Sequence, residues 1–220
     1  ILTFLINFFK LYYHDPRPFW SSDAIKAFEC IAQYGNPSGH SIVAFATSLQ
    51  ALLSYFENSG DRSSRTKSLG LICAAILYAF AVAYSRLLLG VHSLDQVLFG
   101  GLMGVWLACT LHWLVREPLN RHLDRIVARS DLRYTQWTFL WALVLVAVYA
   151  ALILNYICAE PVNLPEWTTR IVAKCGSSAM LHAFEAKSML DNGQTAVGFG
   201  AYLGLLFRAS KFPNLTTVGD

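Results

Sequence analysis

Three short polar clusters interrupt otherwise apolar stretches of this 220-residue chain. They are Lys10 with Arg17-Pro18, then Pro37-Ser38-Gly39-His40, then Ser85-Arg86 followed by His92. Together the clusters contain three cations, two imidazoles and a small-residue turn, which are the groups that phosphoryl transfer requires. Fixed Lys and Arg side chains neutralise phosphate oxygens, one imidazole can attack phosphorus, and another can protonate the leaving oxygen.

The order and spacing of the clusters resemble the three-part signature of the type 2 phosphatidic acid phosphatase superfamily. This superfamily includes lipid phosphatases, glucose-6-phosphatases and vanadium haloperoxidases. In this chain six residues separate Lys10 from Arg17-Pro18, residues 37–40 read Pro-Ser-Gly-His, and five residues separate Ser85-Arg86 from His92. The resemblance covers residues 10–96, and residues 97–220 carry no motif of comparable strength.

The resemblance implies a role for each residue at a matching position. His92 is the expected nucleophile, which forms a phosphohistidine, and His40 is the expected acid that protonates the leaving oxygen and then activates water. The expected phosphate-binding groups are Lys10, Arg17, Ser38, Gly39 and Arg86. The family chemistry relies on these side chains, so the resemblance implies neither a metal nor another cofactor.

One position departs from the family pattern. The signature usually has Asp four residues after the nucleophilic His, where this chain has Gln96, with Asp95 one residue earlier. A Gln carbonyl can accept the second ring N–H of His92 and fix its tautomer, although it lacks the charge of a carboxylate. Asp95 is the alternative, but one residue on a helix is a rotation of about 100°. Glucose-6-phosphatases, which this segment resembles, also carry Gln here.

Composition indicates a membrane protein independently of the clusters. Hydrophobic residues make up 55% of the chain and charged residues 14%, against roughly 25% charged residues in soluble domains. Apolar runs lie at 41–56, 68–84, 97–115 and 136–158, with a shorter one at 197–207. A mixed stretch at 165–187 fits either a further span or an amphipathic interfacial helix. We predict one all-α domain over 1–220, a polytopic transmembrane helix bundle of about six spans with short interfacial helices, its first span truncated at Ile1.

Alternation of the predicted spans assigns all three clusters to one side of the membrane. The opposite side receives most of the other basic loop residues, namely Arg62, Arg65, Lys67, Arg116, Arg121, Arg125, Arg129 and Arg133. The positive-inside rule makes that opposite side cytoplasmic or matrix-like. The site is therefore expected to face a lumen or the exterior, in the endoplasmic reticulum, another endomembrane or the plasma membrane.

The resemblance implies an integral-membrane, metal-independent phosphatase that hydrolyses a phosphate monoester, with a lipid phosphate as the family-level preference. Two alternatives stay open: a sugar phosphatase similar to glucose-6-phosphatase, and a catalytically idle relative that serves as a structural subunit of a larger membrane assembly. The expected partners are the phosphorylated substrate and membrane lipids. The basic stretch 116–133 is interrupted by Glu117, Asp124 and Asp131, which favours a solvated interfacial helix over a nucleic-acid site.

Cysteines and glycines give two further structural expectations. Cys30, Cys158 and Cys175 can each reach the side of the clusters, where an oxidising lumen would allow one disulfide, and the sequence leaves the pairing open. Small residues in two predicted spans suit close helix packing: Gly100, Gly101 and Gly104 in one, Gly198, Gly200 and Gly204 in the last. No metal site is expected, because His14, His112, His122 and His182 lack ligands at suitable spacing.

Overall fold

The computed structural model describes residues 2–31, 33–59, 65–127, 134–158, 165–176 and 193–211. All regular structure in these ranges is helical, which confirms the predicted all-α class for the described part of the chain. The elements are α1 (Leu2–Tyr13), α2 (Pro18–Ser21), α3 (Gly39–Ser59), α4 (Arg65–Leu88), α5 (Leu94–Thr110), the π-helical turn η2 (Leu111–Val115), α6 (Arg116–Val127), α7 (Tyr134–Cys158), α8 (Pro165–Cys175) and α10 (Gly193–Lys211).

Two of the described helices are long and apolar enough to cross a membrane. They are α4 and the continuous helical segment Leu94–Asp124, which runs from α5 into α6; a shorter apolar segment, Leu140–Ala151, lies within α7. The predicted six spans are therefore not confirmed. The stretch predicted at 41–56 is helical as part of α3, but the polar side chains of Gln50 and Ser54 interrupt its apolar character, and Glu57 follows it directly. Of the mixed stretch 165–187, residues 165–175 form α8 and residues 177–187 lie outside the described ranges.

The glycines of α5 allow close contact with α3. A Cβ atom at Gly100 would lie 2.6 Å from the carbonyl oxygen of Ser38, and one at Gly104 would lie 2.5 Å from that of Ile42. Only glycine fits at such separations, so the predicted close packing of this helix is confirmed. The same prediction is wrong for α10, where added Cβ atoms at Gly198, Gly200 and Gly204 meet no described atom within 4 Å. These glycines face away from the described helices.

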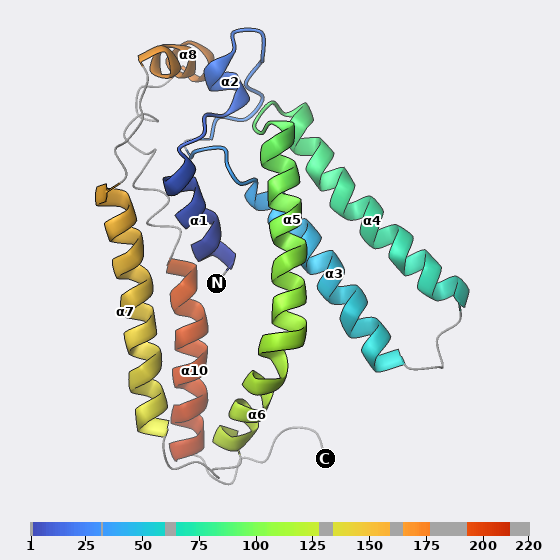
Figure 1. Cartoon of the computed structure of the whole chain (residues 1–220), viewed down its shortest axis with the longest axis vertical. Helices are drawn as coiled ribbons and strands as arrows, with labels where there is room; N and C mark the ends of the chain where they lie inside the picture. The colour runs from blue at the N-terminus through green and yellow to red at the C-terminus, as the bar shows by residue number, and fades with distance from the viewer. Residues whose placement is uncertain are drawn as a thin grey trace.

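The three polar clusters lie at one end of the helices. Figure 1 shows the ends of α1 and α4 and the beginnings of α3 and α5 in the upper part of the molecule, beneath α2 and α8. Hydrogen bonds between the clusters confirm this placement, because Arg17 contacts His92 and the Ser38 N–H donates to the carbonyl of Gln96. The alternation of helices therefore brings together residues that are 82 positions apart, from Lys10 to His92.

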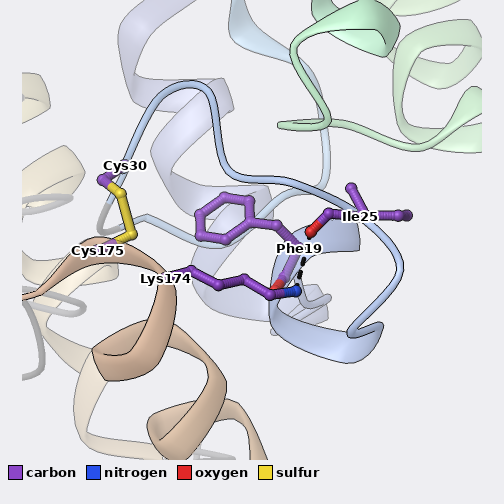
Figure 2. The surroundings of a disulfide bond; sticks show 5 residues. All are labelled: Phe19, Ile25, Cys30, Lys174 and Cys175. Atoms are coloured by element: carbon purple, nitrogen blue, oxygen red, sulfur yellow. Dashed lines mark hydrogen bonds between the residues drawn. A yellow bond between two sulfur atoms is a disulfide. The ribbon is translucent and has the colours of Figure 1, made fainter.

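Helix α8 packs against α2 and binds the segment that follows it. Ile171 packs in an apolar cluster with Phe19 and Trp20 of α2, and the Lys174 ammonium donates to the backbone carbonyls of Phe19 and Ile25 at 3.1 and 2.9 Å (Figure 2). It also donates to the carbonyl of Ser22. Three carbonyl acceptors around one cation fix this segment on α8.

A disulfide joins the same two elements. Cys30, in the segment after α2, pairs with Cys175 at the end of α8 (Figure 2). The structure thereby settles the pairing that the sequence left open, and Cys158 is free and exposed. Together, the disulfide and Lys174 connect residues 19–30 with the far C-terminal half of the chain.

Candidate active site

The ends of the neighbouring helices determine where the two histidine-containing clusters lie. After α4, Gly90 takes a left-handed conformation, with φ of 68°, that turns the chain so that His92 points back into the molecule. Ser93 then caps α5, and the Gln96 side chain accepts the Ser93 N–H at 3.3 Å. In the second cluster, Gly39 begins α3, and the N-terminus of a helix favours an anion.

His92 has a defined tautomer. Its side chain is buried, with 4% of the residue exposed. Arg17 Nη1 lies 3.3 Å from its Nε2, and Gln96 Oε1 lies 3.3 Å from its Nδ1. Because a guanidinium can only donate and a carbonyl oxygen can only accept, Nε2 carries the lone pair and Nδ1 carries the proton. This is the form in which Nε2 can act as a nucleophile.

The surroundings keep His92 neutral. Burial is the largest effect and lowers the pKa of His92 well below its ordinary value, with the charges of Arg17 and Lys10 acting in the same direction. The hydrogen bond to Gln96 opposes this lowering of the pKa. The imidazole is therefore uncharged near neutral pH, as a nucleophilic nitrogen requires.

Gln96 occupies the position behind His92, and Asp95 does not. The Gln96 amide also donates to the carbonyl of Pro16 at 3.0 Å, so both ends of the side chain are held. A Cβ atom at Gly35 would lie 2.4 Å from Gln96 Oε1, which shows that glycine at this position makes room for the amide. Asp95 is exposed at the first turn of α5, one residue round the helix.

Arg17 connects the loops of the site. It is 1% exposed, and it donates to the carbonyls of Gln33 and Val91 at 2.6 and 2.8 Å in addition to its contact with His92. Burial, with a smaller contribution from the charge of Arg86, lowers the pKa of Arg17 to about 9, so the guanidinium remains charged near neutral pH. Arg17 thus orients His92 as well as supplying positive charge.

The remaining residues of the first two clusters are also held by polar contacts. Lys10 Nζ donates to Gln33 Oε1 at 2.6 Å. Ser38 is fully buried, its N–H donates to the Gln96 carbonyl at 3.1 Å, and its hydroxyl accepts from Ser41 Oγ at 2.9 Å. Ser38 is therefore a structural residue that joins the second cluster to α5, and Gly39 is the first residue of α3.

Arg86 has a partner that the sequence patterns do not reveal. Its Nη2 lies 2.7 Å from Glu29 Oε2, and the Arg86 and Glu29 side chains are 9% and 44% exposed. Glu29 belongs to no motif and lies in an irregular segment, so only the structure identifies it. The same is true of Gln33, which joins Lys10 to Arg17 through its side chain and its carbonyl.

His40 is exposed, yet it belongs to the same charged site. Partial burial is the largest cause that lowers its pKa, followed by the charge of Arg86, while the charge of Glu29 opposes this change in the pKa. Lys10 and Arg17 also lower the pKa of His40. The three cations that act on His92 therefore act on His40, and the two imidazoles share one electrostatic environment.

A pocket of about 490 Å³ opens beside His92. Its other lining residues come from α2 and the segment after it, from the end of α4, and from the turn between α4 and α5: Pro18, Ala24, Ile25, Lys26, Phe28, Leu87, Leu88, Gly90 and Ser93. The lining is mainly apolar, with one exposed ammonium at Lys26. Within the described ranges, no three His, Cys, Asp or Glu side chains gather as a metal site.

The chain matches a known protein family. Residues 1–119 match the model of the PAP2 superfamily, which is more than half of the chain and includes all three clusters. No curated protein and no solved structure matches the chain. The matched region ends within α6, so α7, α8 and α10 lie beyond it.

Proposed function

Because this chain belongs to the PAP2 superfamily, we propose that it is a membrane phosphatase that hydrolyses a phosphate monoester through a phosphohistidine at His92. The observation that carries the proposal is the hydrogen-bonded series Arg17, His92 and Gln96. It places the Nε2 lone pair of a neutral imidazole next to Arg17 and within the electrostatic reach of Lys10 and Arg86, an arrangement suited to attack on a phosphate.

The first step transfers the phosphoryl group to the protein. The Nε2 atom of His92 forms a bond to phosphorus as the bond to the ester oxygen breaks, and His40 gives a proton to that oxygen. The Arg17 N–H that now meets Nε2 turns to a phosphate oxygen when the substrate enters. Lys10 and Arg86 neutralise the other oxygens, and Gln96 stabilises the Nδ1–H as the ring becomes positive.

The second step returns the free protein. His40, now neutral, accepts a proton from water as the water oxygen attacks phosphorus, and the bond from phosphorus to Nε2 breaks. Inorganic phosphate leaves, and both imidazoles return to their starting states. The charge needed at phosphorus comes from Lys10, Arg17 and Arg86, so we propose that no added metal is required.

The pocket beside His92 supports a lipid phosphate as the substrate. Ile25, Leu87 and Leu88 line it together with the ring of Phe28, and such a lining favours an apolar leaving group next to the phosphate. A sugar phosphate is the second candidate, because the Gln at position 96 is shared with the glucose-6-phosphatases that the segment resembles. A polar sugar would gain less from this apolar lining.

The surface of the helices supports integration into a membrane. On α4 the large apolar side chains Leu69, Leu77, Phe80 and Tyr84 are 59% to 70% exposed. Contact with lipid instead of water would avoid the cost of hydrating this surface, roughly 25 cal/mol per Å². We propose a multi-pass arrangement with the site facing a lumen or the exterior, since Arg65, Lys67, Arg116 and Arg121 lie toward the opposite ends of their helices.

The test is phosphate release by the detergent-purified protein from a phosphatidic acid and from a sugar phosphate, with EDTA present. We expect release from the lipid to be faster, to be inhibited by vanadate, and to disappear in His92→Ala. Faster release from the sugar phosphate would make a sugar phosphate, and not a lipid phosphate, the preferred substrate. No release from either, with the wild-type protein folded, would favour the structural-subunit alternative.

A further inference from the structure

The ion pair between Arg86 and Glu29 uses only part of the Arg86 guanidinium. Arg86 Nη2 is used by Glu29 Oε2 at 2.7 Å. Arg86 Nε is buried and has no hydrogen-bond partner in the described part of the chain. The carboxylate thus uses one nitrogen of the guanidinium and leaves the buried Nε–H as a donor that an anion can use.

The fold anchors the segment that carries Glu29. The next residue, Cys30, is bonded to Cys175 of α8, and Lys174 holds the carbonyls of Ser22 and Ile25 on the other side. The carboxylate is therefore presented to Arg86 by a segment that is fixed at two places. An exposed ion pair on a loose segment would be worth little, but these restraints reduce the entropy that the pair must offset.

We propose that Glu29 is a positioning residue for phosphoryl transfer: its carboxylate holds Arg86 at the phosphate and sustains the proton that His40 donates to the leaving oxygen. This inference rests on the proposed phosphatase function. Glu29 lies outside the three motifs, so neither their spacing nor the family match assigns it a role.

The charges around His40 explain how Glu29 would sustain the proton of His40. Arg86 of α4, Lys10 of α1 and Arg17 of the following loop all lower the pKa of His40, and Glu29 is the group whose charge raises it. Without the carboxylate, the pKa of His40 would fall further. A smaller fraction of His40 would then be protonated near neutral pH, and less general acid would be available for a poor leaving group.

The experiment compares Glu29→Gln with the wild-type protein on an alkyl phosphate and an activated aryl phosphate. We expect kcat on both substrates to fall when Arg86 loses its carboxylate partner, and kcat on the alkyl phosphate to fall about tenfold further, because only the poor leaving group needs the proton. The basic limb of the alkyl-phosphate pH profile should move to lower pH. Glu29→Asp should retain most of the wild-type behaviour.

Asp23→Asn is the matched control, since Asp23 lies on the same segment and pairs with Arg170 at 3.0 Å, away from Arg86. It should leave both substrates and the pH profile unchanged. A loss in Glu29→Gln that is no greater on the alkyl phosphate than on the aryl phosphate, or an unmoved basic limb, would overturn the inference.

An NMR titration of the His40 ring keeps this test separate from the proposed function. The pKa of His40 should be lower in Glu29→Gln than in the wild-type protein even if neither releases phosphate. An unchanged pKa would overturn the role of Glu29. Absence of turnover in the wild-type protein would instead overturn the phosphatase proposal.

Discussion

His92 is held at both ring nitrogens, and the two contacts have different consequences. Arg17 donates to Nε2, the atom that the proposed mechanism frees for attack on phosphorus, whereas Gln96 accepts from Nδ1, which the proposed mechanism leaves protonated. The Gln96 amide is itself held by Pro16 and faces Gly35. The neutral carbonyl can therefore orient the ring, although it stabilises the imidazolium less than a carboxylate would.

Substitution of Gln96 tests this orienting contact. In Gln96→Ala the kcat should fall about tenfold to a hundredfold, as expected for the loss of a hydrogen bond to a group that becomes charged. Gln96→Asp should preserve or raise kcat, because a carboxylate stabilises the imidazolium. Asp95→Asn is the matched control and should be nearly silent, since Asp95 is exposed. Damage from Asp95→Asn together with a silent Gln96→Ala would reverse the two assignments.

His40 gives a prediction that depends on the leaving group. His40→Ala should slow an alkyl phosphate by about 10² to 10⁴ and an activated aryl phosphate much less, since the aryl oxygen leaves without protonation. Rates of phosphoenzyme formation measured by rapid quench would separate this step from hydrolysis. The same loss on both substrates would contradict the role of His40 as the acid in the first step.

The lowered pKa values of the two histidines also predict how stability depends on pH. The folded-state pKa of both His40 and His92 is lowered, so below about pH 6.5 the unfolded chain binds more protons than the folded one. The free energy of unfolding should therefore decrease as the pH falls from 6.5 toward the folded-state values. Both pH 7.5 and pH 5 lie about a unit or more from the pKa of His in the unfolded chain. Between these two pH values, Tm should fall less in His92→Gln than in the wild-type protein. An equal fall in both would exclude His92 as a source of the acid sensitivity.

At the scale of helices, the contact between α3 and α5 sets the distance between the second and third clusters. Gly100 faces the Ser38 carbonyl, and Gln96 lies one turn earlier on α5. A displacement of α5 from α3 would thus move Gln96 and Ser38 apart and loosen the support of His92.

Gly100→Ala tests this coupling. The added methyl group would lie 2.6 Å from the Ser38 carbonyl oxygen, so the helices must separate and both Tm and kcat should fall. The expected cost in stability is about 1 to 3 kcal/mol, typical of overpacking. Gly198→Ala is the control, because a Cβ atom there meets no described atom within 4 Å and the change should be neutral. A neutral Gly100→Ala would show that this contact does not hold the site.

Sequence periodicity and motif spacing predict the helical elements and the common end at which the clusters meet. They cannot predict the irregular segment between α2 and α3, because its residues follow no repeat and its contacts come from distant elements. Glu29 pairs with α4, Gln33 with α1, and Cys30 with α8, across sequence separations that no local pattern encodes. Likewise, glycine spacing alone could not distinguish the packed Gly100 from the open Gly198.

The whole molecule combines a motif-bearing N-terminal half with a C-terminal segment that secures it. The family match ends at residue 119, yet Lys174 and Cys175 fix the segment that supplies Glu29 and one wall of the pocket. The disulfide also agrees with a site on the oxidising side of a membrane. Activity of this protein is therefore expected to require α8 as well as the three clusters.

The most direct test of the phosphohistidine mechanism is to trap the phosphoryl group on the protein. The wild-type protein would be mixed with a labelled phosphate monoester, quenched under alkaline conditions within one turnover, and digested for mass spectrometry. The phosphohistidine mechanism predicts an acid-labile phosphoryl group on the imidazole of His92, absent in His92→Ala. A phosphoryl group on another residue, or full turnover by His92→Ala, would contradict it.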